Sequence, residues 1–123
     1  MAPQQRHPTW HQTFVDRAAL PGTTPLAAYL LRLMAKKQTN LCLSADVTTT
    51  SELLDIAEEC GDSICILKTH CDIISDFGAR TVHGLLEIAA RKKFLIFEDR
   101  KFSDIGSESS YHAEDPSLTA ALG

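Results

Sequence analysis

Apolar residues between positions 25 and 97 follow two different spacings. In three segments they recur every three or four positions, which is typical of an amphipathic helix. Each of these segments is followed by a short, mostly apolar run bounded by turn residues, which is typical of a strand buried on both faces. The pattern predicts helices over residues 25–40, 49–61 and 82–93, and strands over residues 41–47, 64–67 and 94–97.

Residues at the ends of these segments support the helix boundaries. Thr24 is expected to cap the first helix, because its side chain can accept a hydrogen bond from a backbone N–H of the first turn. Thr49 and Glu52 have the spacing of a capping box at the start of the second helix, and Gly61 can end that helix. The basic run 91–93 suits the negative end of the third helix.

The order of the predicted elements indicates the fold class. Helices and strands alternate along the chain, which predicts a parallel sheet with helical crossovers. Two architectures fit this pattern, a doubly wound sheet and a (β/α)₈ barrel. No glycine-rich phosphate loop follows the first strand, so the dinucleotide-binding version of the doubly wound sheet is disfavoured.

Composition narrows the class of protein. Hydrophobic residues make up 44% and charged residues 23% of the 123-residue chain, which is ordinary for one small globular domain. The net charge of -4, with no long Lys/Arg run, argues against nucleic acid or an anionic membrane as a partner. The apolar runs are too short to span a bilayer and the first residues do not resemble a signal peptide, so we expect a cytosolic location.

The four cysteines, Cys42, Cys60, Cys65 and Cys71, form no C-x-x-C pair. Without a secretion signal we expect them to be reduced. Cys65 and Cys71 lie near His70, but this spacing fits no zinc pattern, and we predict no metal site.

Charged residues follow each predicted strand. Asp46 comes after the first strand, Lys68 after the second, and Glu98, Asp99 and Lys101 after the third. Barrel enzymes build their active sites from the carboxyl ends of the strands. Each residue alone is explained by a strand that ends at the protein surface, but three successive strands with charged ends favour a site.

The charged residues after the third strand could stabilise a carbanion. If the third strand extends far enough, Asp99 and Lys101 point to the same face, with Asp104 three residues further on. A lysine between carboxylates keeps its proton, because the opposite charges favour the ammonium form. Such a group is a poor nucleophile, but it can stabilise and protonate a carbanion without a cofactor. The alternative is an exposed turn that has this pattern by chance.

Three segments, 41–47, 67–70 and 94–106, closely resemble successive segments of eukaryotic orotidine 5′-phosphate decarboxylases, and most of all the fungal monofunctional enzymes. The resemblance extends over residues 25–106. It implies a (β/α)₈ barrel, usually dimeric, that converts orotidine 5′-phosphate to UMP and CO₂ without a metal or organic cofactor. Here it implies an α/β partial (β/α)₈ TIM barrel, made of the first three β/α units and an N-terminal helix.

The resemblance also implies roles for individual residues. Lys101 protonates the C6 carbanion, and Asp99 lies beside the departing carboxylate. Lys68 belongs to the charge network and contacts the ribose, and Asp104 reaches the other subunit's site across a homodimer. The implied substrate-binding residues are Asp46, Lys68, Thr69, His70, Asp99, Lys101, Asp104 and Ile105.

The end of the chain departs from the family pattern. Glu108 stands where the family usually has a threonine, and residues 107–123 contain no Val, Ile or Phe. We therefore predict a tail over residues 1–23 with one or two helical turns near 14–20, a partial barrel over residues 24–106, and a divergent, disordered tail over residues 107–123.

Three predicted strands are too few to close a barrel, so we expect this chain to be inactive by itself. The alternatives are a magnesium-dependent sugar-phosphate barrel that shares the D-x-K-x-x-D motif, and a non-catalytic partial barrel that acts through protein interaction.

Overall fold

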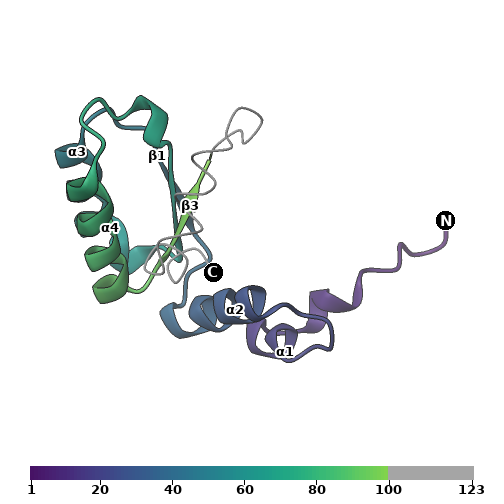
Figure 1. The fold of residues 1–123 in the computed structure, drawn as a ribbon. Coiled ribbons are helices and arrows are strands. Elements are labelled where there is room, and N and C mark those ends of the chain that lie inside the picture. Colours follow the sequence, from purple (N-terminus) through teal and green to yellow (C-terminus); the bar gives the residue numbers. More distant parts are fainter. Residues whose placement is uncertain (100–123) are drawn as a thin grey trace.

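The computed structural model describes residues 1–99. Its helices are α1 (Phe14–Ala18), α2 (Pro25–Lys37), α3 (Thr50–Cys60) and α4 (Ala79–Lys92), and its strands are β1 (Cys42–Ala45), β2 (Ile66–Thr69) and β3 (Leu95–Glu98) (Figure 1). Short 3₁₀ turns occupy Pro8–His11, Gly61–Ser63 and Cys71–Ile73. The predicted alternation of helices and strands is confirmed. The helical turns expected near residues 14–20 correspond to α1, which packs against α2.

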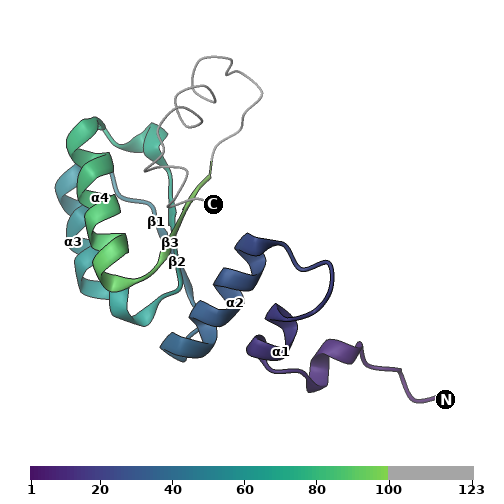
Figure 2. The same ribbon diagram turned by 60° about the horizontal axis from the view of Figure 1, so that its bottom comes forward.

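The three strands form one parallel sheet in the order β1-β2-β3. Helices α3 and α4 lie side by side on the same face of this sheet (Figure 2). Two crossovers that step in one direction along a sheet place both helices on one face, as in a barrel, whereas a doubly wound sheet reverses direction to cover both faces. The architecture is therefore an α/β fold consistent with the first units of a (β/α)₈ barrel, as predicted.

The hydrophobic core lies between the sheet and the helix pair α3/α4. Leu67 of β2 and Leu53 of α3 have no exposed surface, and Leu85 and Ile88 of α4 pack into the same cluster. Because successive strand residues point to opposite faces, Leu67 faces the helices while its neighbour Lys68 faces the other side of the sheet. That second face carries exposed side chains such as Phe97.

Helix starts follow the predicted capping chemistry, with one difference. The Thr24 hydroxyl accepts a hydrogen bond from the Ala27 backbone N–H, as expected. The Thr49 hydroxyl accepts one from the Glu52 backbone N–H, but the Glu52 carboxylate accepts its bond from the Thr49 hydroxyl rather than from the Thr49 backbone. Only the first half of the expected capping box is therefore formed at α3.

Gly61 follows α3 for a reason other than the predicted one. Its backbone is right-handed, with φ at -55°, and the chain continues into a 3₁₀ turn instead of ending in a left-handed residue. A Cβ atom at this position would lie 2.9 Å from the Lys92 Cβ and 3.0 Å from the Phe94 ring. The glycine is required because the end of α4 packs closely against it.

Lys37, the last residue of α2, joins three parts of the fold. Its ammonium lies within hydrogen-bonding distance of four carbonyl oxygens, those of Gly61 and Ile64, which follow α3, and those of Lys92 and Lys93 at the end of α4. These carbonyls lie where α3 and α4 end, and the negative end of a helix dipole favours a cation. The contact anchors α2 at the amino end of the sheet.

Candidate functional site

Lys68 and Asp99 form an ion pair at the carboxyl edge of the sheet. The Lys68 Nζ lies 3.0 Å from the Asp99 Oδ2, and the two side chains are 38% and 51% exposed. Lys68 is in register with Phe97 on the neighbouring strand, and Asp99 lies two residues beyond Phe97, so both charged side chains point to the same face. This is the face that α3 and α4 leave uncovered.

The strand β2 extends two residues beyond its predicted end, to Thr69. Lys68 therefore lies inside the strand, whereas the sequence pattern placed it after the strand. The extension arises because residues 44 and 45 of β1 pair with residues 68 and 69 of β2. A backbone fixed on both sides by ladder hydrogen bonds holds Lys68 more rigidly than a loop does.

The surroundings of Lys68 keep it charged. The hydrogen bond from its ammonium to Asp99, and then the charge of Asp99, raise the pKa of Lys68, while partial burial acts in the opposite direction. The charges of Asp46 and Cys42 add to the upward shift of this pKa. The structure thus brings Asp46, Lys68 and Asp99 to one edge of the sheet, with the lysine as an ammonium ion at neutral pH.

Thr69 and His70 occupy different positions relative to this pair. Thr69 is 1% exposed, and its hydroxyl donates a hydrogen bond to the Glu98 carboxylate at 2.6 Å on the helix-facing side of the sheet. His70 is half-buried and directly follows β2, where its carbonyl accepts a hydrogen bond from the Ile73 backbone N–H. The predicted substrate segment is therefore divided, with Lys68 on one face and the Thr69 side chain on the other.

Glu98 was predicted to lie at the charged carboxyl edge of the sheet, but it was not among the predicted site residues. Its carboxylate accepts hydrogen bonds from the Thr69 hydroxyl, the Cys71 backbone N–H and the Cys71 thiol. The sequence signal that indicates this role is a carboxylate two positions after Ile96, at a strand position that faces the helices.

Three predicted site residues, Lys101, Asp104 and Ile105, lie outside the described residues 1–99, and their roles stay predictions. Within residues 1–99, no group of three or more His, Cys, Asp or Glu side chains is arranged to hold a metal ion. The helices of this described part are all too short or too polar to cross a membrane.

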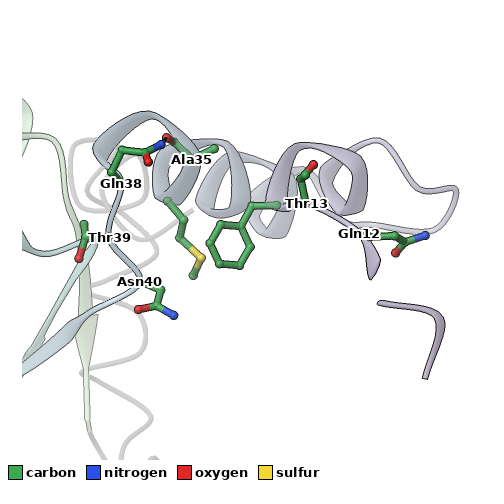
Figure 3. Close-up of a pocket in the computed structure, with 8 residues that line it drawn as sticks. Gln12, Thr13, Ala35, Gln38, Thr39 and Asn40 are labelled. Carbon is green, nitrogen blue, oxygen red and sulfur yellow. Dashed lines mark hydrogen bonds between the residues drawn. The ribbon is translucent and has the colours of Figure 1, made fainter. Parts of the chain in front are cut away.

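A cavity of about 500 Å³ lies between α1 and α2 (Figure 3). Polar and apolar side chains line it together; the lining residues are Gln12, Thr13, Phe14, Met34, Ala35, Gln38, Thr39 and Asn40. Residues 39 and 40 immediately precede β1, so the cavity lies near the amino end of the sheet. The Lys68–Asp99 pair lies at the opposite end, and the cavity is not part of that site.

The sequence of this chain is similar to those of known proteins. Residues 39–121 match the family model described as "Orotidine 5'-phosphate decarboxylase / HUMPS family". An orotidine 5′-phosphate decarboxylase of Aureobasidium pullulans is 69% identical over 102 residues, which are 83% of this chain and 38% of that protein. A uridine 5′-monophosphate synthase of Bos taurus is 58% identical over 77% of this chain and 20% of its own length. The Saccharomyces cerevisiae decarboxylase is 52% identical over 77% of this chain and 36% of its own length.

Proposed function

Because the chain belongs to the orotidine 5′-phosphate decarboxylase / HUMPS family, we propose that it forms the first part of an active site that converts orotidine 5′-phosphate to UMP and CO₂, in pyrimidine biosynthesis. The single observation that carries the proposal is the Lys68–Asp99 ion pair at the carboxyl edge of a parallel sheet. This edge is where barrel enzymes place their catalytic groups. The chain spans well under half the length of these relatives, so the activity proposed is that of a complete barrel.

Decarboxylation breaks the bond between C6 of the pyrimidine and its carboxylate carbon. CO₂ leaves, and the bonding electron pair stays on C6. Ammonium groups stabilise the negative charge of this electron pair most effectively when they are already in place before the charge develops. The Lys68 ammonium is in place and charged before the reaction begins, because Asp99 fixes its position and raises the pKa of Lys68.

The resemblance assigns the remaining step to Lys101. We propose that its ammonium donates a proton to the C6 carbanion, which gives UMP and a neutral amine that takes up a proton from water. Asp99 lies beside the substrate carboxylate, and repulsion between the two carboxylates favours the loss of CO₂. Both steps use side chains of the protein alone, so we propose no cofactor.

Substrate binding completes the proposal. Asp46 and the segment Lys68–His70 bind the nucleotide near its ribose, with Ile105 also in contact. Asp104 reaches the site of a second copy across a homodimer. We propose a cytosolic location for this dimer, without nucleic-acid or membrane partners.

The names of the relatives favour one of the three functions considered for this chain. Those compared above are named for orotidine 5′-phosphate decarboxylation or for UMP synthesis. These names favour the decarboxylase over a magnesium-dependent sugar-phosphate enzyme and over a non-catalytic partial barrel.

A chimeric enzyme tests the proposal directly. Residues 1–106 of this chain are joined to the part of the Aureobasidium pullulans decarboxylase that follows the matching glycine, and formation of UMP is measured. We expect the chimera to be active, and we expect Lys68→Ala and Asp99→Asn to lower kcat by roughly a hundredfold or more, as for other groups that stabilise developing charge. Lys36→Ala, at an exposed lysine of α2, is the matched control.

An inactive chimera that is folded and dimeric would contradict the proposal. Full activity of folded Lys68→Ala or Asp99→Asn would remove the ion pair from the mechanism. Turnover by the 123-residue chain without added residues would show that the expected inactivity of the partial barrel is wrong.

A further inference from the structure

The Glu98 carboxylate accepts three hydrogen bonds from the end of β2 and the turn that follows it. Its Oε2 accepts from the Thr69 hydroxyl at 2.6 Å and from the Cys71 thiol at 2.8 Å, and its Oε1 accepts from the Cys71 backbone N–H at 3.0 Å. Glu98 is half-buried and Thr69 is buried. Hydrogen bonds to an ionised carboxylate are shorter and stronger than those between neutral groups, so this contact ties β2 firmly to β3.

The contact lies on the opposite face of the sheet from the Lys68–Asp99 ion pair. Thr69 and Glu98 are partners in the strand register, Lys68 immediately precedes Thr69, and Asp99 immediately follows Glu98. The Asp99 backbone N–H also donates to the Thr69 carbonyl at 2.9 Å. Because the backbone is shared, a displacement of the end of β2 relative to β3 changes the contacts on both faces together.

We propose that Glu98 is a positioning residue: by holding Thr69 and Cys71, it fixes the end of β2 against β3 and keeps the Lys68 ammonium in place beside Asp99. The catalytic meaning of this inference rests on the proposed function, because Glu98 acts through Lys68 and does not contact the reacting atoms. The same three hydrogen bonds fix both ends of the segment 69–71, and so orient His70 at the rim.

The test uses the whole 123-residue chain and a change that leaves its charge unaltered. Thr69→Val removes the hydroxyl donor but keeps the side-chain shape, and Thr69→Ser, which keeps the donor, is the matched control. NMR of carbon-labelled lysine follows the titration of Lys68, and hydrogen exchange follows the Asp99 backbone N–H.

We expect Thr69→Val to lower the pKa of Lys68 toward its ordinary value, because the ion pair with Asp99 loosens. Exchange of the Asp99 amide should accelerate roughly tenfold, since a hydrogen bond to a charged group changes a local opening equilibrium by at least about that factor. Thr69→Ser should retain the wild-type behaviour in both measurements. An unchanged Lys68 titration and unchanged Asp99 exchange in folded Thr69→Val overturn the inference.

Two further variants keep the test decisive if Thr69→Val does not fold. Cys71→Ala removes the thiol donor and leaves Thr69 in place, and it should move both readouts in the same direction by a smaller amount. Glu98→Gln places an amide NH₂ group where donors already point. Because Glu98→Gln also changes the charge of the chain, Asp99 exchange is the deciding measurement for this variant, and wild-type exchange in both variants overturns the inference.

The inference and the proposed function fail in different ways. Acceleration of Asp99 exchange in the Thr69→Val chain, combined with a folded chimera that makes no UMP, supports the positioning role and rejects the decarboxylase. An active chimera, combined with an unchanged Lys68 titration and unchanged Asp99 exchange in folded Thr69→Val, supports the decarboxylase and rejects the positioning role.

Discussion

The hydroxyl oxygens of Thr50 and Thr81 lie 2.7 Å apart in the buried space where α3 and α4 begin. The Gly78 backbone N–H donates to the Thr81 hydroxyl, and the Thr50 hydroxyl contacts the Asp76 carbonyl. Both threonines are almost fully buried, at 1% and 0% exposure. The starts of the two helices are thus linked by a short chain of hydrogen bonds at the same edge of the sheet as the candidate site.

Thr81→Val should therefore lower the free energy of unfolding by about 1–2 kcal/mol, because the Gly78 N–H and the Thr50 hydroxyl each lose a partner in a buried place. Thr81→Ser keeps the hydroxyl and removes one methyl group, so its cost should be smaller, at most about 1 kcal/mol. Urea unfolding measures both values. A larger loss in the serine variant would show that packing, and not the hydroxyl pair, holds the helices together here.

Asp76 makes the stability of the fold depend on pH in the acidic range. The Thr50 backbone N–H donates to its carboxylate at 2.8 Å, and this bond, together with the Thr50 hydroxyl, lowers the pKa of Asp76 from its ordinary value of 3.8. A lowered pKa in the folded state means that the unfolded chain binds the proton more tightly. The stabilisation is therefore present above pH 3.8 and is lost as the pH falls through the lower pKa of the folded state.

Asp76→Asn keeps an oxygen that can accept from Thr50 but does not titrate. We expect the wild-type chain to lose more stability between pH 5 and pH 3 than this variant does, as measured by thermal unfolding at each pH. The same loss in both proteins would contradict a role for Asp76 in the acid sensitivity of the fold.

Lys37 should be more important to stability than its position at the end of α2 suggests. Burial lowers the pKa of Lys37, with Asp62 and Cys65 acting in the opposite direction, and the ammonium is surrounded by carbonyl oxygens from the segment after α3 and from the end of α4. Lys37→Met should lower the free energy of unfolding by about 2 kcal/mol, since hydrogen bonds from a charged donor are lost. Lys36→Met changes the exposed neighbour and should have an effect within about 0.5 kcal/mol.

Equal effects of the two lysine substitutions in urea unfolding would show that α2 is held by its apolar contacts alone. A larger effect at Lys36 would contradict the anchoring role directly.

Two glycines with close neighbours should respond differently to alanine. At Gly61 a Cβ would lie 2.9 Å from the Lys92 Cβ, which is attached to the backbone and cannot move away, so Gly61→Ala should cost about 1–3 kcal/mol. At Gly84 the nearest atoms are the methyl carbons of Leu54, also at 2.9 Å, which can rotate away. Alanine gains about 1 kcal/mol over glycine inside a helix, so Gly84→Ala should be close to neutral.

Thermal unfolding compares the two alanine variants under one condition. A neutral Gly61→Ala would show that the end of α4 can shift at little cost, and a strongly destabilised Gly84→Ala would show that Leu54 has no other conformation.

The sequence by itself determined the alternation of helices and strands, the parallel sheet and the edge at which charged residues gather. Hydrophobic spacing and capping residues carry this information locally, and the carboxyl ends of parallel strands always meet at one edge. The recognisable segments around residues 41–47, 67–70 and 94–106 also determined the family.

Only the tertiary structure decided the register, and with it the face of the sheet on which each rim side chain lies. A strand has a side-chain period of two, so its exact end and its pairing decide what points to each side. The pairing between residues 44–45 and 68–69 placed Lys68 inside β2. The pairing of residues 68–69 with residues 97–98 of β3 then placed Lys68 beside Asp99 and Thr69 beside Glu98. Similarly, Gly61 is explained by the approach of Lys92, a residue distant in the sequence. Such contacts depend on how separate segments pack, and the local pattern of residues does not contain that information.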